Sequence, residues 1–183
     1  MNTPSSVSRR LADSLQAHAR GDYEGALVHF FPALDKVAKR RRPKATVGSR
    51  IRSFLSDEEA LISAIATGNV LRNICVDGIT FPDAIYQFGR TSIAHEGELD
   101  RRLTISNGGS LTIGEIWALP SSYITALCIA VMAAPECAGE RINGDATITL
   151  FGSTWHLNEL WGAHERLKES IATAFRKPHL FSK

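Results

Sequence analysis

Cysteine is scarce in this sequence, and it contains neither a long apolar run nor a recognisable secretory signal. Three of its 183 residues are cysteines, and their odd number and wide spacing argue against a disulfide framework and against a metal-binding repeat. The longest apolar segment, YITALCIAVMAAP, is too short to span a membrane and is typical of a buried helix. The N-terminal MNTPSSVSRRLADSLQ has arginines without an apolar segment behind them. We therefore expect a protein of the reducing cytoplasm with no membrane partner.

The motifs that hold common cofactors are missing as well. The sequence has no glycine-rich loop that would cradle a phosphate, no dinucleotide-binding fingerprint, and no nucleophile elbow at the GST triplet that begins at Gly152. His156, Glu159 and His164 would spread over about 140° of a helix, so they do not converge like metal ligands. We expect no metal ion and no cofactor, and assign these three residues to core or surface roles.

Length and periodicity predict one mainly helical domain that spans residues 1–183. Apolar residues make up 44% of the chain and the mean hydropathy is -0.08, values of an ordinary globular protein that buries a core without disulfides. Apolar residues at helical spacing predict helices from a cap at Ser5 or Ser6 to His18, at about 23–41 with Pro32 inside, at 48–55, from Ser56-Asp57 to Gly68, from about Phe81, from about Ser121, and at about 154–175.

A small β element interrupts this helical pattern. Two short alternating runs flank Asn107-Gly108-Gly109-Ser110, which predicts a β-hairpin at about 103–114. The segment ATITLF adds one candidate strand after a turn at Gly144-Asp145. Since two strands alone are marginally stable, the hairpin must pack against helices. The expected fold is a helical bundle with a small inserted hairpin.

Positive charge is concentrated in the segment DKVAKRRRPK, although the net charge of the chain is only +2. One interpretation is a solvated helix C-terminus, where cations complement the helix dipole and a proline ends the helix. The other is a surface that holds a nucleic-acid phosphate backbone. The candidate phosphate-binding residues are Lys39, Arg40, Arg41, Arg42 and Lys44.

The segment FGRTSIAHEGELDRR contains the strongest candidate for a reaction site, Arg90 and His95. Thr80, Asp83 and Pro82 form a capping pattern that starts this helix at about Phe81. Five positions of a regular helix separate two side chains by roughly 140°, so a continuous helix does not bring Arg90 and His95 together. Either the helix loosens before Gly97, or the same helix of a second copy completes the site across a two-fold axis.

The chemistry of the pair is sufficient for RNA cleavage without a metal ion. A neutral histidine takes a proton from the ribose 2′-hydroxyl near neutral pH, and an arginine stabilises the charge that develops on the attacked phosphate. The alternative is a purely structural role at a helix end, in which His95 pairs with Glu96, Glu98 or Asp100, and Arg90 pairs with an acidic residue elsewhere. Asp35, on the second predicted helix, is a candidate partner for Arg90.

The string GRTSIAHEGEL on a helix of a small bundle resembles the motif of the HEPN superfamily, an arginine followed after four to six residues by a histidine. The resemblance extends to the helical core, where LVHFFPALDKVAKRRR is similar to an early helix of bacterial HEPN-like proteins. It implies a HEPN-like bundle that forms a homodimer. Active members of the superfamily are metal-independent ribonucleases, often toxins or antiviral effectors, with two motifs facing each other across the dimer.

If the roles in the HEPN motif are carried over to this sequence, Arg90 and His95 would be catalytic, with Thr91, Glu96 and Asp35 as supporting residues. Thr91 stands where many members have asparagine or aspartate, and the tyrosine of an adenylylated toxin branch is missing. The resemblance thus predicts an endoribonuclease that leaves 2′,3′-cyclic phosphate ends, and an antitoxin or another protein as a further partner. The alternative is a non-catalytic HEPN-like module that binds RNA or another protein.

Overall fold

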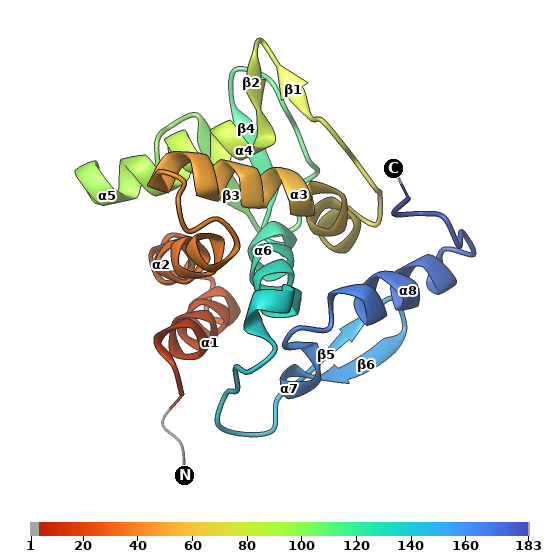
Figure 1. Ribbon diagram of the computed structural model, residues 1–183. Coiled ribbons are helices and arrows are strands. Elements are labelled where there is room, and N and C mark those ends of the chain that lie inside the picture. The colour runs from red at the N-terminus through yellow and green to blue at the C-terminus, as the bar shows by residue number, and fades with distance from the viewer. Residues whose placement is uncertain (1–3, 183) are drawn as a thin grey trace.

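Helices make up most of the computed structural model, which describes residues 4–182. The helices are α1 (Ser6–Ala19), α2 (Tyr23–Arg41), α3 (Val47–Thr67), α4 (Phe81–Ala84), η1 (Ile85–Thr91), α5 (Ser92–Glu96), α6 (Ser122–Ala133), η2 (Pro135–Cys137), α7 (Leu157–Leu160) and α8 (His164–Ala174). The strands are short: β1 (Cys75–Val76), β2 (Ile79–Thr80), β3 (Leu103–Ser106), β4 (Trp117–Pro120), β5 (Thr147–Leu150) and β6 (Ser153–His156). The prediction of a mainly helical chain is confirmed (Figure 1).

Helix α6 lies at the centre of the molecule, and the other long helices pack around it (Figure 1). Ten of its side chains, from Tyr123 to Ala133, are buried, so the helix is apolar on all sides, as expected for a core element. Helices α1, α2, α3 and α8 contact it from different directions. The prediction that this segment forms a buried helix is confirmed, and its start at Ser121 is correct.

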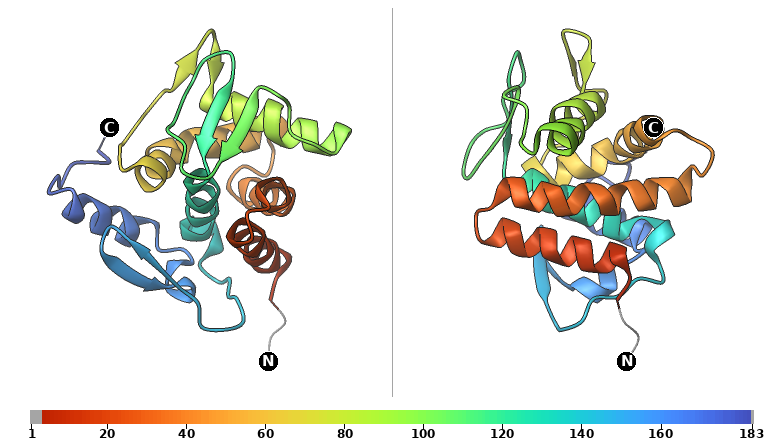
Figure 2. Two further views of the ribbon diagram at one scale, coloured as in Figure 1. Left: turned by 180° about the vertical axis from the view of Figure 1, so that it is seen from behind. Right: turned by 90° about the vertical axis from the view of Figure 1, so that its left-hand side faces the viewer.

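Helices α1 and α2 form an antiparallel pair along one side of the molecule (Figure 2, right). The hydroxyl of Ser5 accepts hydrogen bonds from the first turn of α1, and the carboxylate of Asp22 accepts one from Gly25 in α2. These side chains satisfy amide groups that have no partner inside a helix. The predicted limits of both helices are confirmed.

Helix α3 is continuous, which contradicts the predicted break at Ser56-Asp57. The apolar face runs through the expected break, from Ile51 and Phe54 to Leu61 and Ile62. Asp57 does not cap a new helix because its carboxylate accepts hydrogen bonds from arginines at the end of α2. The helix ends at Gly68, which has a φ of 71° and closes the last turn in the left-handed conformation.

The parallel strand pair β3–β4 replaces the predicted hairpin at 103–114, which is wrong. Leu103 pairs with Trp117 and Ser106 with Pro120, while residues 107–116 form the connection between the strands (Figure 2, left). Burial decides this pairing, because Leu103, Trp117 and Leu119 are all buried, whereas Leu111 and Ile113 are only partly buried. Thr112 folds back to form a single antiparallel bridge to Ala118.

A true hairpin occurs later in the chain, at residues 147–156, and its second strand occupies the start of the helix predicted over 154–175. Strands β5 and β6 are antiparallel and joined at Phe151 and Gly152, whose φ values of 50° and 81° fit a tight hairpin turn. The predicted strand in ATITLF is therefore confirmed as β5. The predicted C-terminal helix is instead divided into β6, α7 and α8.

Gly162 separates α7 from α8, and we expect its replacement by alanine to destabilise the fold. Its φ is 70°, and an added Cβ would lie 2.6 Å from Cα of Ala138. Gly21 is a matched control, since its φ is 77° and an added Cβ would meet nothing within 4 Å. We expect a loss of about 1 kcal/mol in unfolding free energy for Gly21→Ala and of about 3 kcal/mol for Gly162→Ala, measured by chemical denaturation. Equal losses would contradict close packing at Gly162.

Candidate functional site

Arg90 and His95 lie on the rod formed by α4, η1 and α5, and its free end projects from the body of the molecule (Figure 1). Thr80 caps the start of this rod by accepting a hydrogen bond from the Asp83 amide at 3.2 Å, which confirms the predicted helix start. Arg90 is partly exposed and His95 is exposed. Both side chains are therefore accessible to solvent.

The helix is widened into a π-helix over Ile85–Thr91, so Arg90 is not in regular α geometry. A π-helix bonds each amide five residues back and takes more residues per turn, so each residue turns through a smaller angle. Only Arg90 and Thr91 of the stretch that ends at His95 belong to this π-helix, and Ser92–Glu96 is α-helical, so the two side chains stay close to the roughly 140° separation of a regular helix. A single chain therefore does not bring Arg90 and His95 together, which leaves a second copy as the way to complete the site. Irregular helical turns of this kind are frequent at functional sites.

The surroundings of Arg90 are aromatic and basic. Its guanidinium lies 5.9 Å from the ring centroid of Tyr86, and that of Arg52 lies 4.7 Å from the same ring. Arg52 also lies 3.5 Å from the carboxylate of Asp83. Within residues 4–182, neither Arg90 nor His95 forms an ion pair with a carboxylate. The structure thus does not show the alternative in which acidic neighbours neutralise both groups.

The remaining residues predicted to support the pair are placed differently. Asp35 does not bind Arg90, because its carboxylate accepts a hydrogen bond at 2.7 Å from Arg50, so the predicted pairing is wrong. Thr91 is the last residue of η1, directly after Arg90, and is partly exposed. Glu96 ends α5 as an exposed residue. Its neighbour Gly97 closes the helix with a φ of 83°, as its position in the sequence predicted.

The basic run at the end of α2 is mostly neutralised inside the molecule. Arg40 donates to Glu140 at 2.7 Å, and Arg42 donates to Asp57 at 2.7 Å. Arg41 is more deeply held, with ion pairs to three carboxylates and its guanidinium 4.3 Å from the Phe54 ring centroid. These three arginines form ion pairs within the molecule, which favours the interpretation of a helix C-terminus over that of a phosphate-binding run. Of the five candidate phosphate-binding residues, only Lys39 and Lys44 have no carboxylate partner in the described part of the chain.

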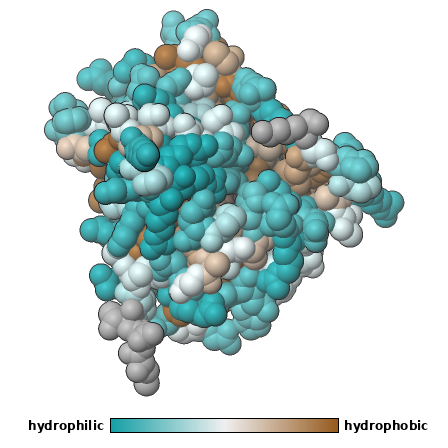
Figure 3. Space-filling model, viewed as in Figure 1, coloured by the Kyte–Doolittle hydropathy of each residue, from teal (hydrophilic) through white to brown (hydrophobic). Residues whose placement is uncertain are grey.

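A buried ion cluster lies where α2, α3, η2 and α8 meet, and the sequence did not reveal it. Glu58 has a side-chain exposure of 2% and accepts hydrogen bonds from Arg41 at 2.8 Å and from His164 at 2.8 Å. Glu136 binds the other nitrogens of Arg41 at 2.8 and 3.0 Å. The space-filling view shows a strongly hydrophilic area over the junction of α2 and α3 (Figure 3). Glu58 and His164 are separated by 106 positions, so no local pattern links them.

The cluster shifts the pKa of each titratable member. Burial pushes the pKa of Glu58 upward, but hydrogen bonds from His164 and Arg41 outweigh it and leave the pKa below its ordinary value. The hydrogen bond to Glu58 raises the pKa of His164, more than burial lowers it. The buried carboxylate of Glu58 therefore favours the imidazolium form of His164. This interaction gives His164 a packing role, as predicted, but with a charged partner.

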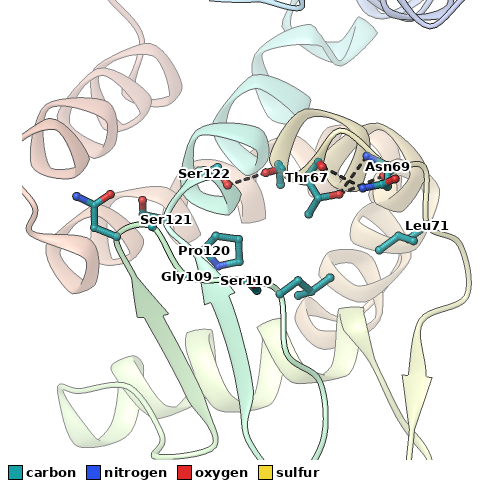
Figure 4. A pocket seen from close by; sticks show the side chains of 12 residues that line it. Thr67, Asn69, Leu71, Gly109, Ser110, Pro120, Ser121 and Ser122 are labelled. Atoms are coloured by element: carbon teal, nitrogen blue, oxygen red, sulfur yellow. Dashed lines mark hydrogen bonds between the residues drawn. The ribbon is translucent and has the colours of Figure 1, made fainter.

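A cavity of about 730 Å³ lies between the end of α3, the β3–β4 connection and the start of α6 (Figure 4). Ser122 donates from its hydroxyl to the carbonyl of Ala66 at 2.7 Å and ties α6 to α3 at its edge. The residues that line this cavity carry amides, hydroxyls and apolar groups, and none of them is ionisable. The cavity therefore lacks an acid–base group of its own.

Comparison with known proteins identifies the family. The sequence model of the Rv1289 family matches residues 6–181. The chain belongs to the Rv1289 family. The chain is 25% identical to "Uncharacterized protein Rv1289" of Mycobacterium tuberculosis and to "Uncharacterized protein Mb1320" of Mycobacterium bovis, over 91% of this chain and 88% of each relative. No solved structure matches this Rv1289-family protein.

No helix within residues 4–182 is long and apolar enough to cross a membrane. No group of three or more histidine, cysteine, aspartate or glutamate residues in the same range has the arrangement of a metal site. Cys75, Cys128 and Cys137 are free, and burial raises the pKa of the Cys128 and Cys137 thiols to about 12.

Proposed function

We propose that this protein is a HEPN-like, metal-independent endoribonuclease that acts as a homodimer in the cytoplasm. The observation that carries the proposal is the state of Arg90 and His95. Both are accessible on a projecting rod, and within residues 4–182 neither is paired with a carboxylate. A histidine in this setting is available to accept a proton, and an arginine is available to bind a phosphate oxygen.

The reaction uses a nucleophile from the substrate. The 2′-hydroxyl gives its proton to His95 while its oxygen attacks the adjacent phosphorus. Arg90 binds a non-bridging phosphate oxygen and stabilises the charge on the pentacoordinate phosphorus. The bond from phosphorus to the 5′-oxygen then breaks, and that oxygen takes a proton from solvent. The products carry a 2′,3′-cyclic phosphate and a 5′-hydroxyl.

The contacts around Arg90 support a phosphate-binding role for Arg52 and, from the basic run, for Lys44. Arg52 and Tyr86 lie beside Arg90, and the ring of Tyr86 is an aromatic surface for a base. Lys44 precedes α3, on which Arg52 lies, and has no carboxylate partner within the described residues. The phosphate backbone would follow these residues in place of Arg40, Arg41 and Arg42.

The shape of α5 supports the dimer. None of its residues, Ser92–Glu96, is buried in the single chain, and the helix projects from the core (Figure 1). A second copy would bury this helix and place two Arg90–His95 pairs in one cleft, because a two-fold axis duplicates what lies on it. As a toxin or phage-defence effector, the protein would also be bound by an antitoxin or another regulatory protein.

The decisive experiment is RNA cleavage in EDTA by the purified protein and by the double variant Arg90→Ala/His95→Ala. We expect the wild-type protein to leave 2′,3′-cyclic phosphate ends and the double variant to leave RNA intact. Equal cleavage by the two proteins, or none by either, would contradict a nuclease. RNA binding without cleavage that weakens steeply with salt would instead identify the non-catalytic RNA-binding module. A salt-insensitive interaction with a protein would identify the protein-interaction module.

A further inference from the structure

A cleft of about 870 Å³ opens between α3 and α8, away from the Arg90–His95 rod. Its floor is the buried ion cluster of Glu58, Arg41 and His164, and η2 contributes Pro135 and Glu136 to one wall. The C-terminal segment after α8 forms another wall, and it runs back beside the end of α3 (Figure 1). The cleft is large enough for a small organic molecule.

The carboxylates that line this cleft already have their partners. Glu58 and Glu136 are bound by Arg41, and Asp57 is bound by Arg41 and Arg42. Glu59 accepts hydrogen bonds from the backbone amides of Asn73 at 2.7 Å and Ile74 at 3.0 Å. The acidic groups of the cleft are therefore occupied and do not require a cation from outside.

The hydrogen-bond donors of the cleft are less fully used. Lys168 has no carboxylate partner within residues 4–182, and its only contact of note is with the Phe181 ring, 5.8 Å from the centroid. Arg72 contacts backbone carbonyls through one nitrogen, Nη2, at 2.9 Å from Leu180 and 3.4 Å from Ser182. His164 Nδ1 lies 2.8 Å from the carboxylate of Glu165, which is 81% exposed. A bond to such an exposed carboxylate contributes little and is readily exchanged for a ligand.

We propose that this cleft is a phosphate-binding site in which Lys168, Arg72 and Nδ1 of His164 donate to phosphate oxygens. The excess of free donors over free acceptors selects an anion, and two of these three side chains are permanently charged near neutral pH. Both ring nitrogens of the third lie 2.8 Å from carboxylate oxygens, of Glu58 and Glu165, an arrangement that favours its imidazolium form. Helix α8 begins at His164, so its dipole adds positive potential at the same place.

The phosphate is supplied either as a free anion or as part of a phosphate monoester. Phe181 provides an apolar wall next to Lys168, and Pro135 provides a second apolar edge. These groups would contact the organic part of an ester such as a mononucleotide. The shared chemistry of both sources is the phosphate group, so the same donors serve either one.

The test is titration calorimetry of the intact protein with inorganic phosphate, adenosine 5′-monophosphate and adenosine. We expect saturable binding of the two phosphate compounds, and a roughly tenfold weaker affinity in Lys168→Gln and in Arg72→Gln. Tighter binding of the monophosphate than of inorganic phosphate identifies an ester as the source. Equal binding of the two identifies the free anion.

Two controls keep this test independent of the proposed nuclease. Lys177→Gln changes an exposed lysine outside the cleft and should leave the affinity unchanged. The titrations are repeated in Arg90→Ala/His95→Ala, which removes any phosphate binding at the proposed nuclease site and should leave the binding that depends on Lys168 and Arg72. No binding of either phosphate compound, adenosine binding as tight as that of the monophosphate, or affinities unaltered by Lys168→Gln and Arg72→Gln would overturn the proposal.

Discussion

Replacing Glu58 with alanine is expected to lower the free energy of unfolding by about 3 kcal/mol, because it leaves buried charges without their partner. Glu58 is 2% exposed in its side chain and contacts Arg41 and His164, both at 2.8 Å. Arg41 keeps its two bonds to Glu136, so most of the cost falls on His164 and on the cavity that the truncation leaves. Glu58 also links α3 to α2 through Arg41 and to α8 through His164, so its loss should loosen the attachment of α8.

Chemical denaturation of three variants separates this effect from the general loss of a charge. Asp57→Ala removes the neighbouring carboxylate, whose side chain is 40% exposed, and should cost under about 1 kcal/mol. Glu58→Gln keeps the shape of the side chain and should cost less than Glu58→Ala. If Asp57→Ala and Glu58→Ala destabilise the protein equally, the buried cluster does not stabilise the fold.

The stability due to this cluster should depend on pH in a bell-shaped way. The pKa of His164 is raised from its ordinary value of 6.5, so its contribution is complete below 6.5 and is lost as pH rises through the folded-state value. The pKa of Glu58 is lowered from 4.5, so its contribution is complete above 4.5 and is lost as pH falls through the folded-state value. The other charged groups nearby are Arg41, Glu136, Glu165 and Lys168.

We therefore expect the difference in unfolding free energy between wild type and Glu58→Gln to be greatest between those two ordinary pKa values. Denaturation curves at a series of pH values measure it directly. A difference that does not change from acid to alkaline pH would show that the hydrogen bonds act through shape and not through charge.

The second large effect is expected on RNA cleavage. His95→Ala should lower the rate by roughly 100-fold to 10,000-fold, the range for loss of a general base. Arg90→Ala should lower it by about 100-fold to 1,000-fold, as for loss of one group that stabilises a developing oxyanion. Arg90→Lys keeps the charge but not the planar fork and should recover only part of the rate.

Single-turnover cleavage in EDTA measures these rates, with two variants as matched controls. His179→Ala and Arg20→Ala remove an exposed histidine and an exposed arginine that the proposed site does not use, and both should cleave as wild type does. A residual rate shared by all variants would identify a contaminating nuclease.

Local signals predicted the parts of the fold that depend on neighbouring residues. The caps at Ser5 and Thr80, the limits of α2 and the buried character of α6 all follow from residues within one or two turns. The prediction of a hairpin at 103–114 was wrong, although its turn signal was real, as the φ of 73° at Gly108 shows. The strands that pair are β3 and β4, because their apolar side chains are the buried ones. The predicted break in α3 was wrong because the carboxylate of Asp57 accepts a hydrogen bond from Arg41 of α2 and does not cap a new helix.

For the candidate sites, too, local patterns predicted one part and tertiary packing decided the other. The sequence by itself determined a mainly helical chain with an arginine and a histidine on one helix, because helix periodicity and capping are local properties. Only the tertiary structure decided that the helix is widened over Ile85–Thr91, that Arg41 and Arg42 face carboxylates, and that Glu58 meets His164. Those arrangements depend on which elements pack together, since a charge is neutralised by whatever lies beside it in space and not by its neighbours along the chain.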